Sequence, residues 1–212
     1  ATKDLDIVLV VEALDSAFTE RFWAFVEEGG YEVRERSEGA KVLYRFQKPK
    51  AGDFPAMLEL FSRAREGLKL SEDAHLTPLP IDKAAASLSA ILLDESYYDF
   101  LKSMVREVGG IPVLGEAAII PFKARAWLDL TRQRDEGGNV DEKNIRKHRN
   151  DVARLLQLLS QEARYELPSS VADDMRSFVE QATAEADYDP RQFKVNMTRD
   201  DVATRLRAAY QL

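Results

Sequence analysis

The 212-residue sequence contains no cysteine, only two histidines and no long hydrophobic run. The absence of cysteine excludes disulfide bonds, zinc–thiolate sites and a thiol nucleophile, and it agrees with the cytoplasmic location that we expect. The scarcity of histidine argues against a histidine-based mechanism. A membrane-spanning helix needs roughly 20 consecutive apolar residues. Because no segment approaches that length, we expect no membrane association.

Several common enzyme motifs are missing as well. The sequence has no Gly-x-x-x-x-Gly-Lys loop, no Gly-x-Gly-x-x-Gly, no Gly-x-Ser-x-Gly and no His-Glu-x-x-His. No hydrophobic signal-peptide segment follows the polar first residues. The classes of protein that depend on these motifs can be set aside.

The composition is that of an ordinary globular protein, with 45% hydrophobic and 32% charged residues. The net charge of −7 argues against broad, non-specific binding of nucleic acid, although a local basic patch remains compatible with it. The length allows one or two domains with a sizeable core.

The pattern of apolar residues and turn signals changes near residue 115. Before it, strands and helices are mixed, and after it the pattern is continuously helical, so the sequence predicts an α/β domain at 1–115 and a helical domain at 116–212. This order predicts an α+β fold with a small mixed sheet and flanking helices. Strands are expected at 4–12, 31–36, 42–46, 57–61, 87–93 and 111–114, and helices at 16–28, 95–108, 117–135, 141–160, 168–185 and 198–211.

Two aspartates open the first expected strand. Asp4 and Asp6 are two residues apart, so their side chains lie on the same side of a strand. A third carboxylate, Glu59, lies within the apolar run at 57–61. Close carboxylates repel one another unless a cation lies between them, and Mg²⁺ prefers oxygen ligands. The three residues therefore predict a site for Mg²⁺ or Mn²⁺, on the expectation that they converge at one sheet edge.

Lys123 lies within an apolar stripe of the helix expected at 117–135. Such a lysine either extends its ammonium group to solvent or points into a cleft toward a phosphate. Both interpretations remain open from the sequence.

A basic run begins the helix expected at 141–160. It contains Lys143, Arg146, Lys147 and Arg149, a compact patch that is either a solvated helix face or a phosphate-binding surface. Lys147 and Asp151 are spaced for an ordinary ion pair on one helix face. His148 falls on the apolar face. A histidine at the edge of such a face is more often a structural residue with its hydrogen bonds satisfied than a catalyst.

Four segments resemble, in order and spacing, the AbiEii-type nucleotidyltransferase-like proteins, relatives of toxins in bacterial abortive-infection systems. The segments span most of residues 1–159 and are 1–7 (ATKDLDI), 55–60 (PAMLEL), 120–127 (IPFKARAW) and 147–152 (KHRNDV). The resemblance implies a nucleotidyltransferase-fold sheet followed by a helical half.

The resemblance also implies roles for particular residues. Asp4 and Asp6 would bind Mg²⁺ beside an NTP, with Glu59 as the third carboxylate. Lys123 matches the family's helical lysine, and Lys147 and Asp151 fall on its last motif. The implied catalytic residues are thus Asp4, Asp6, Glu59, Lys123 and Asp151, and the implied phosphate-binding residues are Lys123, Lys147 and Arg146.

One departure from the family concerns the phosphate-binding turn. The family has a Gly-Gly or Gly-Ser turn upstream of the aspartate pair, and the three residues before Asp4 do not supply one. We therefore expect the N-terminal part of the first domain to be incomplete, or else a principal phosphate contact to be lacking.

The functional expectation is a metal-dependent nucleotidyltransferase that uses an NTP to modify an RNA or protein acceptor, with an antitoxin protein as a further partner if it acts as a toxin. Such transfer needs charge neutralisation and in-line positioning more than covalent help from the protein. The alternative is a catalytically silent protein of the same fold that binds a nucleotide or a protein partner. A third interpretation is a structural protein whose acidic strand residues are merely exposed.

Overall fold

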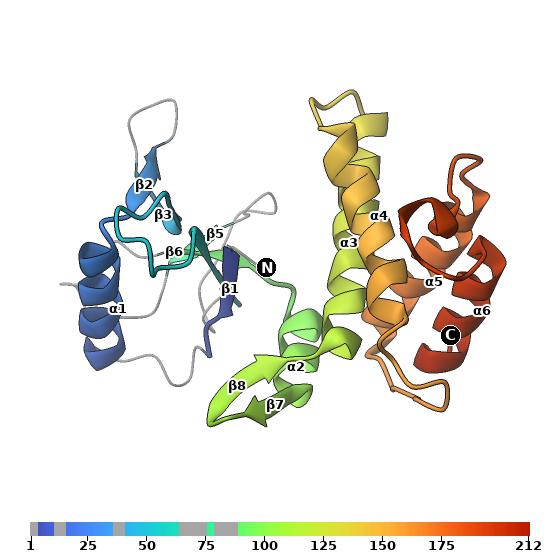
Figure 1. The fold of residues 1–212 in the computed structure, drawn as a ribbon, viewed down its shortest axis with the longest axis horizontal. Coiled ribbons are helices and arrows are strands. Elements are labelled where there is room, and N and C mark those ends of the chain that lie inside the picture. Colours follow the sequence, from blue (N-terminus) through green and yellow to red (C-terminus); the bar gives the residue numbers. More distant parts are fainter. Residues whose placement is uncertain (1–3, 11–15, 36–40, 64–75, 79–88) are drawn as a thin grey trace. The chain divides into compact units, whose positions relative to one another are not determined.

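A computed structural model of the protein describes residues 4–10, 16–35, 41–63, 76–78 and 89–212. The chain divides into two compact units, Ala1–Tyr98 and Asp99–Leu212. The first unit contains a mixed sheet and the second is mainly helical, so the fold is α+β (Figure 1). The expected strand residues 11–12, the expected helix cap at Asp15 and most of the irregular segment expected at 64–86 lie outside the described residues.

The sheet of the first unit has both parallel and antiparallel pairs. Strand β4 lies at its centre: β1 pairs with it in parallel on one side, and β3 pairs antiparallel on the other. The end of β4 pairs in parallel with β6, while β2 pairs with β3 and β5 with β6. Its strands are β1 (Asp4–Val8), β2 (Glu32–Glu35), β3 (Lys41–Gln47), β4 (Met57–Ser62), β5 (Leu76–Pro78) and β6 (Ser89–Leu92).

One face of this sheet is covered by helix α1 (Ser16–Gly29), as expected from the apolar spacing at 16–28. Phe22 of α1 packs edge-on against Phe46 of β3, with ring centroids 5.3 Å apart. The core of the unit comprises Leu9, Phe22, Val26, Tyr31, Phe46, Leu58 and Leu60. Because Leu58 and Leu60 face α1, the residue between them, Glu59, faces the opposite side of the sheet.

Helix α1 ends at a glycine that adopts a left-handed conformation. Gly30 has φ of +61°, which L side chains rarely adopt. Its N–H donates to the carbonyl of Glu27, and the N–H of Tyr31 donates to the carbonyl of Val26. This pair of bonds is the Schellman motif, which satisfies carbonyl groups left free at a helix end.

The second unit begins with α2 (Glu95–Ser103), which starts in the first, and a two-stranded hairpin of β7 (Val105–Val108) and β8 (Ile111–Leu114). A single helix over 95–108 was expected, and that prediction is wrong beyond Ser103. Gly109 and Gly110 both have positive φ, +61° and +80°, as a two-residue type I′ hairpin turn requires. Since β7 pairs with β8 and β8 contacts α3, this hairpin belongs with the helical unit, which moves the division from the expected residue 115 to residue 98.

The remaining helices form the core of the second unit. Helices α3 and α4 run side by side as an antiparallel pair (Figure 1). Trp127 of α3 packs edge-on against Phe178 of α5, with centroids 5.3 Å apart. The helices are α3 (Glu116–Asp135), α4 (Glu142–Leu156), α5 (Ser169–Ala184) and α6 (Arg199–Tyr210), with a short 3-10 helix, η3 (Pro190–Phe193), before α6. None of the helices in the described ranges is both long and apolar enough for a membrane span.

Helix α3 contains an internal proline, Pro121. Proline has no N–H, so the carbonyl of Ala117, four residues earlier, loses its usual helical partner. The hydroxyl of Tyr210, at the end of α6, donates to that carbonyl at 2.9 Å. Tyr210 is buried, and burial raises the pKa of its hydroxyl, which therefore stays protonated as the donor. A residue of α6 thus provides the hydrogen bond to Ala117 that Pro121 cannot donate within α3.

Candidate functional site

The predicted acidic residues lie on the face of the sheet opposite α1. In the parallel pairing of β1 with β4, Asp6 is the partner of Glu59 and Asp4 the partner of Met57. Partners in register on neighbouring strands present their side chains to the same face. Asp4, Asp6 and Glu59 therefore share one face on two adjacent strands.

Glu59 has a cationic partner that the sequence analysis did not anticipate. Arg45 is the register partner of Glu59 on β3, and its guanidinium forms an ion pair and a hydrogen bond with the Glu59 carboxylate. The Glu59 side chain is 13% exposed and that of Arg45 28%. Arg45 therefore supplies the charge compensation that the sequence analysis assigned to a metal ion at Glu59.

Asp4 and Asp6 differ from Glu59 in both exposure and pairing. Both are exposed, and within the described part of the chain neither has an ion-pair or hydrogen-bond partner. Two carboxylates on one side of a strand are oxygen donors of the kind that Mg²⁺ accepts. Among the described residues no group of three or more His, Cys, Asp or Glu side chains is arranged to hold a metal ion. The residues present fit a cation bound by a carboxylate pair rather than by the expected three.

In the helical unit, Lys123 lies at the edge of the buried stripe of α3. Its neighbours Ile120, Ala124 and Trp127 are buried, whereas Lys123 is half-buried. No carboxylate among the described residues forms an ion pair with it. Lys123 is therefore a half-buried cation that forms no ion pair with the residues that the structure describes.

His148 on α4 is influenced by the positive charge of this lysine. Burial, together with the positive charges of Lys123 and Lys147, lowers the pKa of His148 to about 4, against the opposing effect of Asp151. The imidazole is therefore neutral at neutral pH. Its Nδ1 atom is buried without a hydrogen-bond partner, so His148 is not the satisfied edge histidine that the sequence favoured.

Lys147 and Asp151, one helical turn apart on α4, do not form an ion pair with each other. Asp151 accepts a hydrogen bond from Arg154 at 3.0 Å. Lys147 is exposed and, among the described residues, has no ion-pair partner. The ordinary helix-surface ion pair of Lys147 with Asp151 is thus not formed. We call Lys123 and Lys147 the cationic cluster.

Arg149 does not belong to the basic patch in which the sequence analysis placed it. It is 4% exposed and forms ion pairs with Glu185 and, at 3.0 Å, with Asp187. Its guanidinium also lies 4.6 Å from the centroid of the Tyr188 ring. Hydrogen bonding by Arg149 lowers the pKa of the Asp187 carboxyl. Arg149 is therefore a buried structural residue that joins α4 to the segment after α5.

Arg146, predicted to bind phosphate, has a different environment from that of Lys123. It is exposed, and its charge contributes to the lowered pKa of Asp187. Arg146 therefore lies near the ion-paired surface around Arg149, whereas the charges of Lys123 and Lys147 act on His148. The structure separates the predicted phosphate-binding residues of α4 into two groups.

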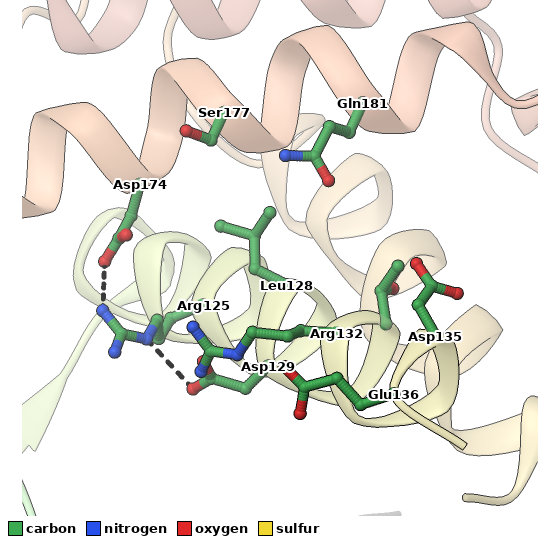
Figure 2. Close-up of a pocket in the computed structure, with 10 residues that line it drawn as sticks. Arg125, Leu128, Asp129, Arg132, Asp135, Glu136, Asp174, Ser177 and Gln181 are labelled. Atoms are coloured by element: carbon green, nitrogen blue, oxygen red, sulfur yellow. Dashed lines mark hydrogen bonds and ion pairs between the residues drawn. The ribbon is translucent and has the colours of Figure 1, made fainter. Parts of the chain in front are cut away.

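A groove of about 520 Å³ lies between α3 and α5 (Figure 2). Arg125 crosses it, bonding Asp129 of α3 at 3.0 Å and Asp174 of α5 at 2.7 Å. These two carboxylates raise the pKa of Arg125 above its usual value against the opposing effect of burial. The groove lining includes none of the sequence-predicted residues. Its charged groups are largely paired with each other, which identifies a helix–helix junction rather than a charged binding site.

Comparison with known proteins adds no assignment. No family model, curated protein or solved structure matches this chain. The functional argument therefore rests on the two unpaired groups described above, Asp4 with Asp6 and the cationic cluster.

Proposed function

We propose that this protein is a metal-dependent nucleotidyltransferase, in which Asp4 and Asp6 of the sheet unit bind Mg²⁺ or Mn²⁺. For the helical unit, taken by itself, we propose that Lys123 and Lys147 bind phosphate. The observation that carries the proposal is the aspartate pair: two exposed carboxylates on one side of β1, with no partner among the described residues. A bound cation would offset the repulsion between these two carboxylates. The resemblance of four sequence segments to AbiEii-type proteins supports a nucleotidyltransferase fold and an RNA or protein acceptor.

Mg²⁺ in such a site is commonly held by one or two carboxylates together with substrate phosphates and water, so two aspartates suffice. When bound, the ion would supply charge neutralisation for the transferring phosphoryl group. Asp4 and Asp6 would hold the ion from one strand. Lys123 and Lys147 neutralise phosphate oxygens, and no covalent step by the protein is needed. Glu59 acts indirectly, because its pair with Arg45 fixes the strand beside Asp6.

The test is incubation of the protein with each labelled NTP, Mg²⁺ and total cellular RNA, with and without added protein acceptors. We expect label to enter a macromolecule only with metal present, and to be lost in Asp6→Asn. Lys123→Met keeps most of the apolar stem and removes the charge, so NTP affinity should fall by about tenfold while stability changes by less than about 0.5 kcal/mol.

Arg132→Gln is a matched control for Lys123→Met, because it removes a cation from the same helix at the α3–α5 groove. NTP affinity should be unchanged in that variant. A folded wild-type protein that neither binds nor transfers any NTP in the presence of Mg²⁺ or Mn²⁺ would end the proposal.

The second candidate function is a catalytically silent protein that binds a nucleotide or a protein partner such as an antitoxin. The Arg45–Glu59 ion pair favours it, because it removes the third expected carboxylate from metal binding. Nucleotide binding that depends on Lys123 without any transfer of label, in wild type and Asp6→Asn alike, distinguishes this function from the enzyme.

A further inference from the structure

The two outer edges of the β7–β8 hairpin differ in their capacity to pair with a further strand. The loop is a two-residue turn, so the pair that closes it, Val108 with Ile111, is hydrogen-bonded. Hydrogen-bonded and non-hydrogen-bonded pairs alternate along an antiparallel ladder, so the next pair, Glu107 with Pro112, directs its backbone groups outward. Because proline has no N–H, the outer edge of β8 lacks a donor at this position.

The outer edge of β7 carries both donors and acceptors. By the same alternation, Val105 and Glu107 direct their N–H and C=O groups away from β8. Every residue of β7 is exposed, and within the described chain β7 forms no backbone hydrogen bond outside its ladder with β8. A row of free backbone groups of this kind is the template to which an extended peptide adds as a strand.

Exposed apolar side chains lie on both faces of the hairpin beside this edge. Val105, Val108 and Ile111 are 49%, 57% and 63% exposed. Val108 and Ile111 lie opposite each other on one face, and Val105 lies on the other. An added strand with β-branched side chains opposite Val105 and Val108 would therefore cover part of both apolar surfaces.

The two charged residues of β7 differ in how they are compensated. The Arg106 guanidinium forms an ion pair with Glu116 at 3.1 Å. It lies against Gly115, where a Cβ would come within 2.7 Å of the Arg106 Cζ atom, so the arginine side chain is turned toward the start of α3. Glu107 is exposed and forms no ion pair with any described residue. A lysine or arginine opposite Glu107 on an added strand would supply the complementary charge.

We propose that the outer edge of β7 binds an extended segment of another protein, which adds as an antiparallel strand with a basic residue opposite Glu107 and β-branched residues opposite Val105 and Val108. The backbone hydrogen bonds of Val105 and Glu107 give affinity, and the side-chain positions give specificity. The proposal is independent of the nucleotide chemistry proposed above.

A second copy of this chain fits the edge less well. Antiparallel pairing of β7 with itself can join Val105 of one copy to Glu107 of the other, and this register places Arg106 opposite Arg106. A shift that keeps the same backbone groups facing each other places Glu107 opposite Glu107. Like charges directly opposite each other are destabilising, so the edge favours a segment of different sequence.

The experiment titrates the peptide Thr-Val-Lys-Glu-Val-Thr, with blocked termini, into the isotope-labelled whole protein. In the proposed register its lysine lies opposite Glu107. We expect the NMR amide signals of Val105 and Glu107 to shift, and the hydrogen exchange of their N–H groups to slow by about tenfold at saturation, because these groups become hydrogen-bonded. The N–H groups of Arg106 and Val108 bond within the hairpin already and should change little.

Two singly N-methylated peptides are a matched pair of probes. Methylation of the lysine nitrogen removes the donor to the Glu107 carbonyl and should weaken binding by about tenfold. Methylation of the following glutamate nitrogen should leave the affinity within about twofold, because that nitrogen is directed away from β7. If both modifications had the same effect, the peptide would not be adding as a strand and the proposal would be wrong.

Two protein variants separate the backbone contribution from the charge. Glu107→Pro removes the outward N–H and should weaken binding by about tenfold, while unchanged signals of Arg106 and Val108 verify that the hairpin is intact. Glu107→Lys should weaken binding of the lysine peptide by about threefold and favour, by a similar factor, a peptide with glutamate in place of that lysine. The same preference in wild type and Glu107→Lys would contradict the complementary charge.

Two further results would overturn the proposal. If the signals of Val105 and Glu107 do not move with peptide at about 1 mM, the edge does not bind a strand. If the Glu107 N–H already exchanges slowly in the free protein, the edge is covered from within. Sedimentation then distinguishes a second copy of the chain, which raises the mass, from another part of the same chain, which does not.

Discussion

The two units of the protein show the same contrast between a buried, paired charge and unpaired charges of one sign. In the sheet unit, Glu59 is largely buried and paired with Arg45, while Asp4 and Asp6 on the neighbouring strand are exposed and unpaired. In the helical unit, Arg149 is buried and paired with Glu185 and Asp187, while Lys123 and Lys147 have no ion-pair partner in the described part of the chain. Each unit therefore combines one internally compensated charge with a group of like charges that nothing in the described chain compensates.

Within each unit, the difference between paired and unpaired charges separates the residues that stabilise the fold from the residues that are available for binding. Pairing and burial make Arg149 and Glu59 contributors to the fold, because a buried charge without its partner is costly. The unpaired groups contribute little to the fold and have opposite signs in the two units. An acidic pair suits a cation and a cationic cluster suits phosphate, so the residues most informative about function are those that the structure leaves uncompensated.

The largest expected effect is on Arg149. Arg149→Ala should lower the free energy of unfolding by about 3 kcal/mol, because it leaves Glu185 partly buried without its partner and removes the packing of the guanidinium over Tyr188. Chemical denaturation measures the change. Arg146→Ala, the exposed neighbour on the same helix, is the control and should change stability by less than about 0.5 kcal/mol. Equal losses in both variants would remove the distinction between paired and unpaired cations.

A smaller effect is expected in the sheet unit. Glu59→Gln should cost about 1–2 kcal/mol of stability, because Arg45 loses a charge-assisted partner. Asp6→Asn, at the register partner on β1, should change stability by no more than about 0.5 kcal/mol, since Asp6 is exposed and its repulsion with Asp4 is relieved. The comparison would break if Asp6→Asn proved as destabilising as Glu59→Gln in the same denaturation assay.

The smallest effect is on acid stability through His148. The folded-state pKa is about 4 against an ordinary 6.5, so between these values the unfolded chain binds a proton that the folded chain does not. His148 therefore lowers stability as pH falls through this window and has no such effect above about pH 6.5. Because the side chain is only partly buried, we expect about 1 kcal/mol. His148→Gln should lose less stability than wild type between pH 7 and pH 4.5, as measured by melting at each pH; parallel curves would contradict the lowered pKa.

Sequence periodicity predicted most helices because capping and spacing agree with the packing that the fold imposes. Helix α4, for example, is capped by Asp141, whose side chain accepts a hydrogen bond from the N–H of Lys143 at 2.9 Å. The β7–β8 hairpin was missed because Leu101, Met104, Val105 and Val108 also fit a helical spacing. The adjacent Gly109-Gly110 between β-branched residues was the available signal for a two-residue hairpin.

The pairing of charges was harder to predict than the elements. Arg149 lies four residues after Ile145 and three before Val152, so the helical spacing already places it on the buried stripe of α4. Its partners, Glu185 and Asp187, come from a distant segment whose position depends on tertiary packing. Arg45 likewise meets Glu59 only through the register of β3 on β4, which local sequence does not specify.

The hydrogen bond from Tyr210 to Ala117 joins two residues 93 positions apart in the chain. By itself, α3 would contain a break in its ladder at Pro121, two residues before Lys123. The Tyr210 hydroxyl supplies the partner that the Ala117 carbonyl lacks, so opening of α6 would leave this carbonyl in the first part of α3 unsatisfied. We therefore expect local unfolding, followed by amide hydrogen exchange, to be coupled between α6 and the first part of α3.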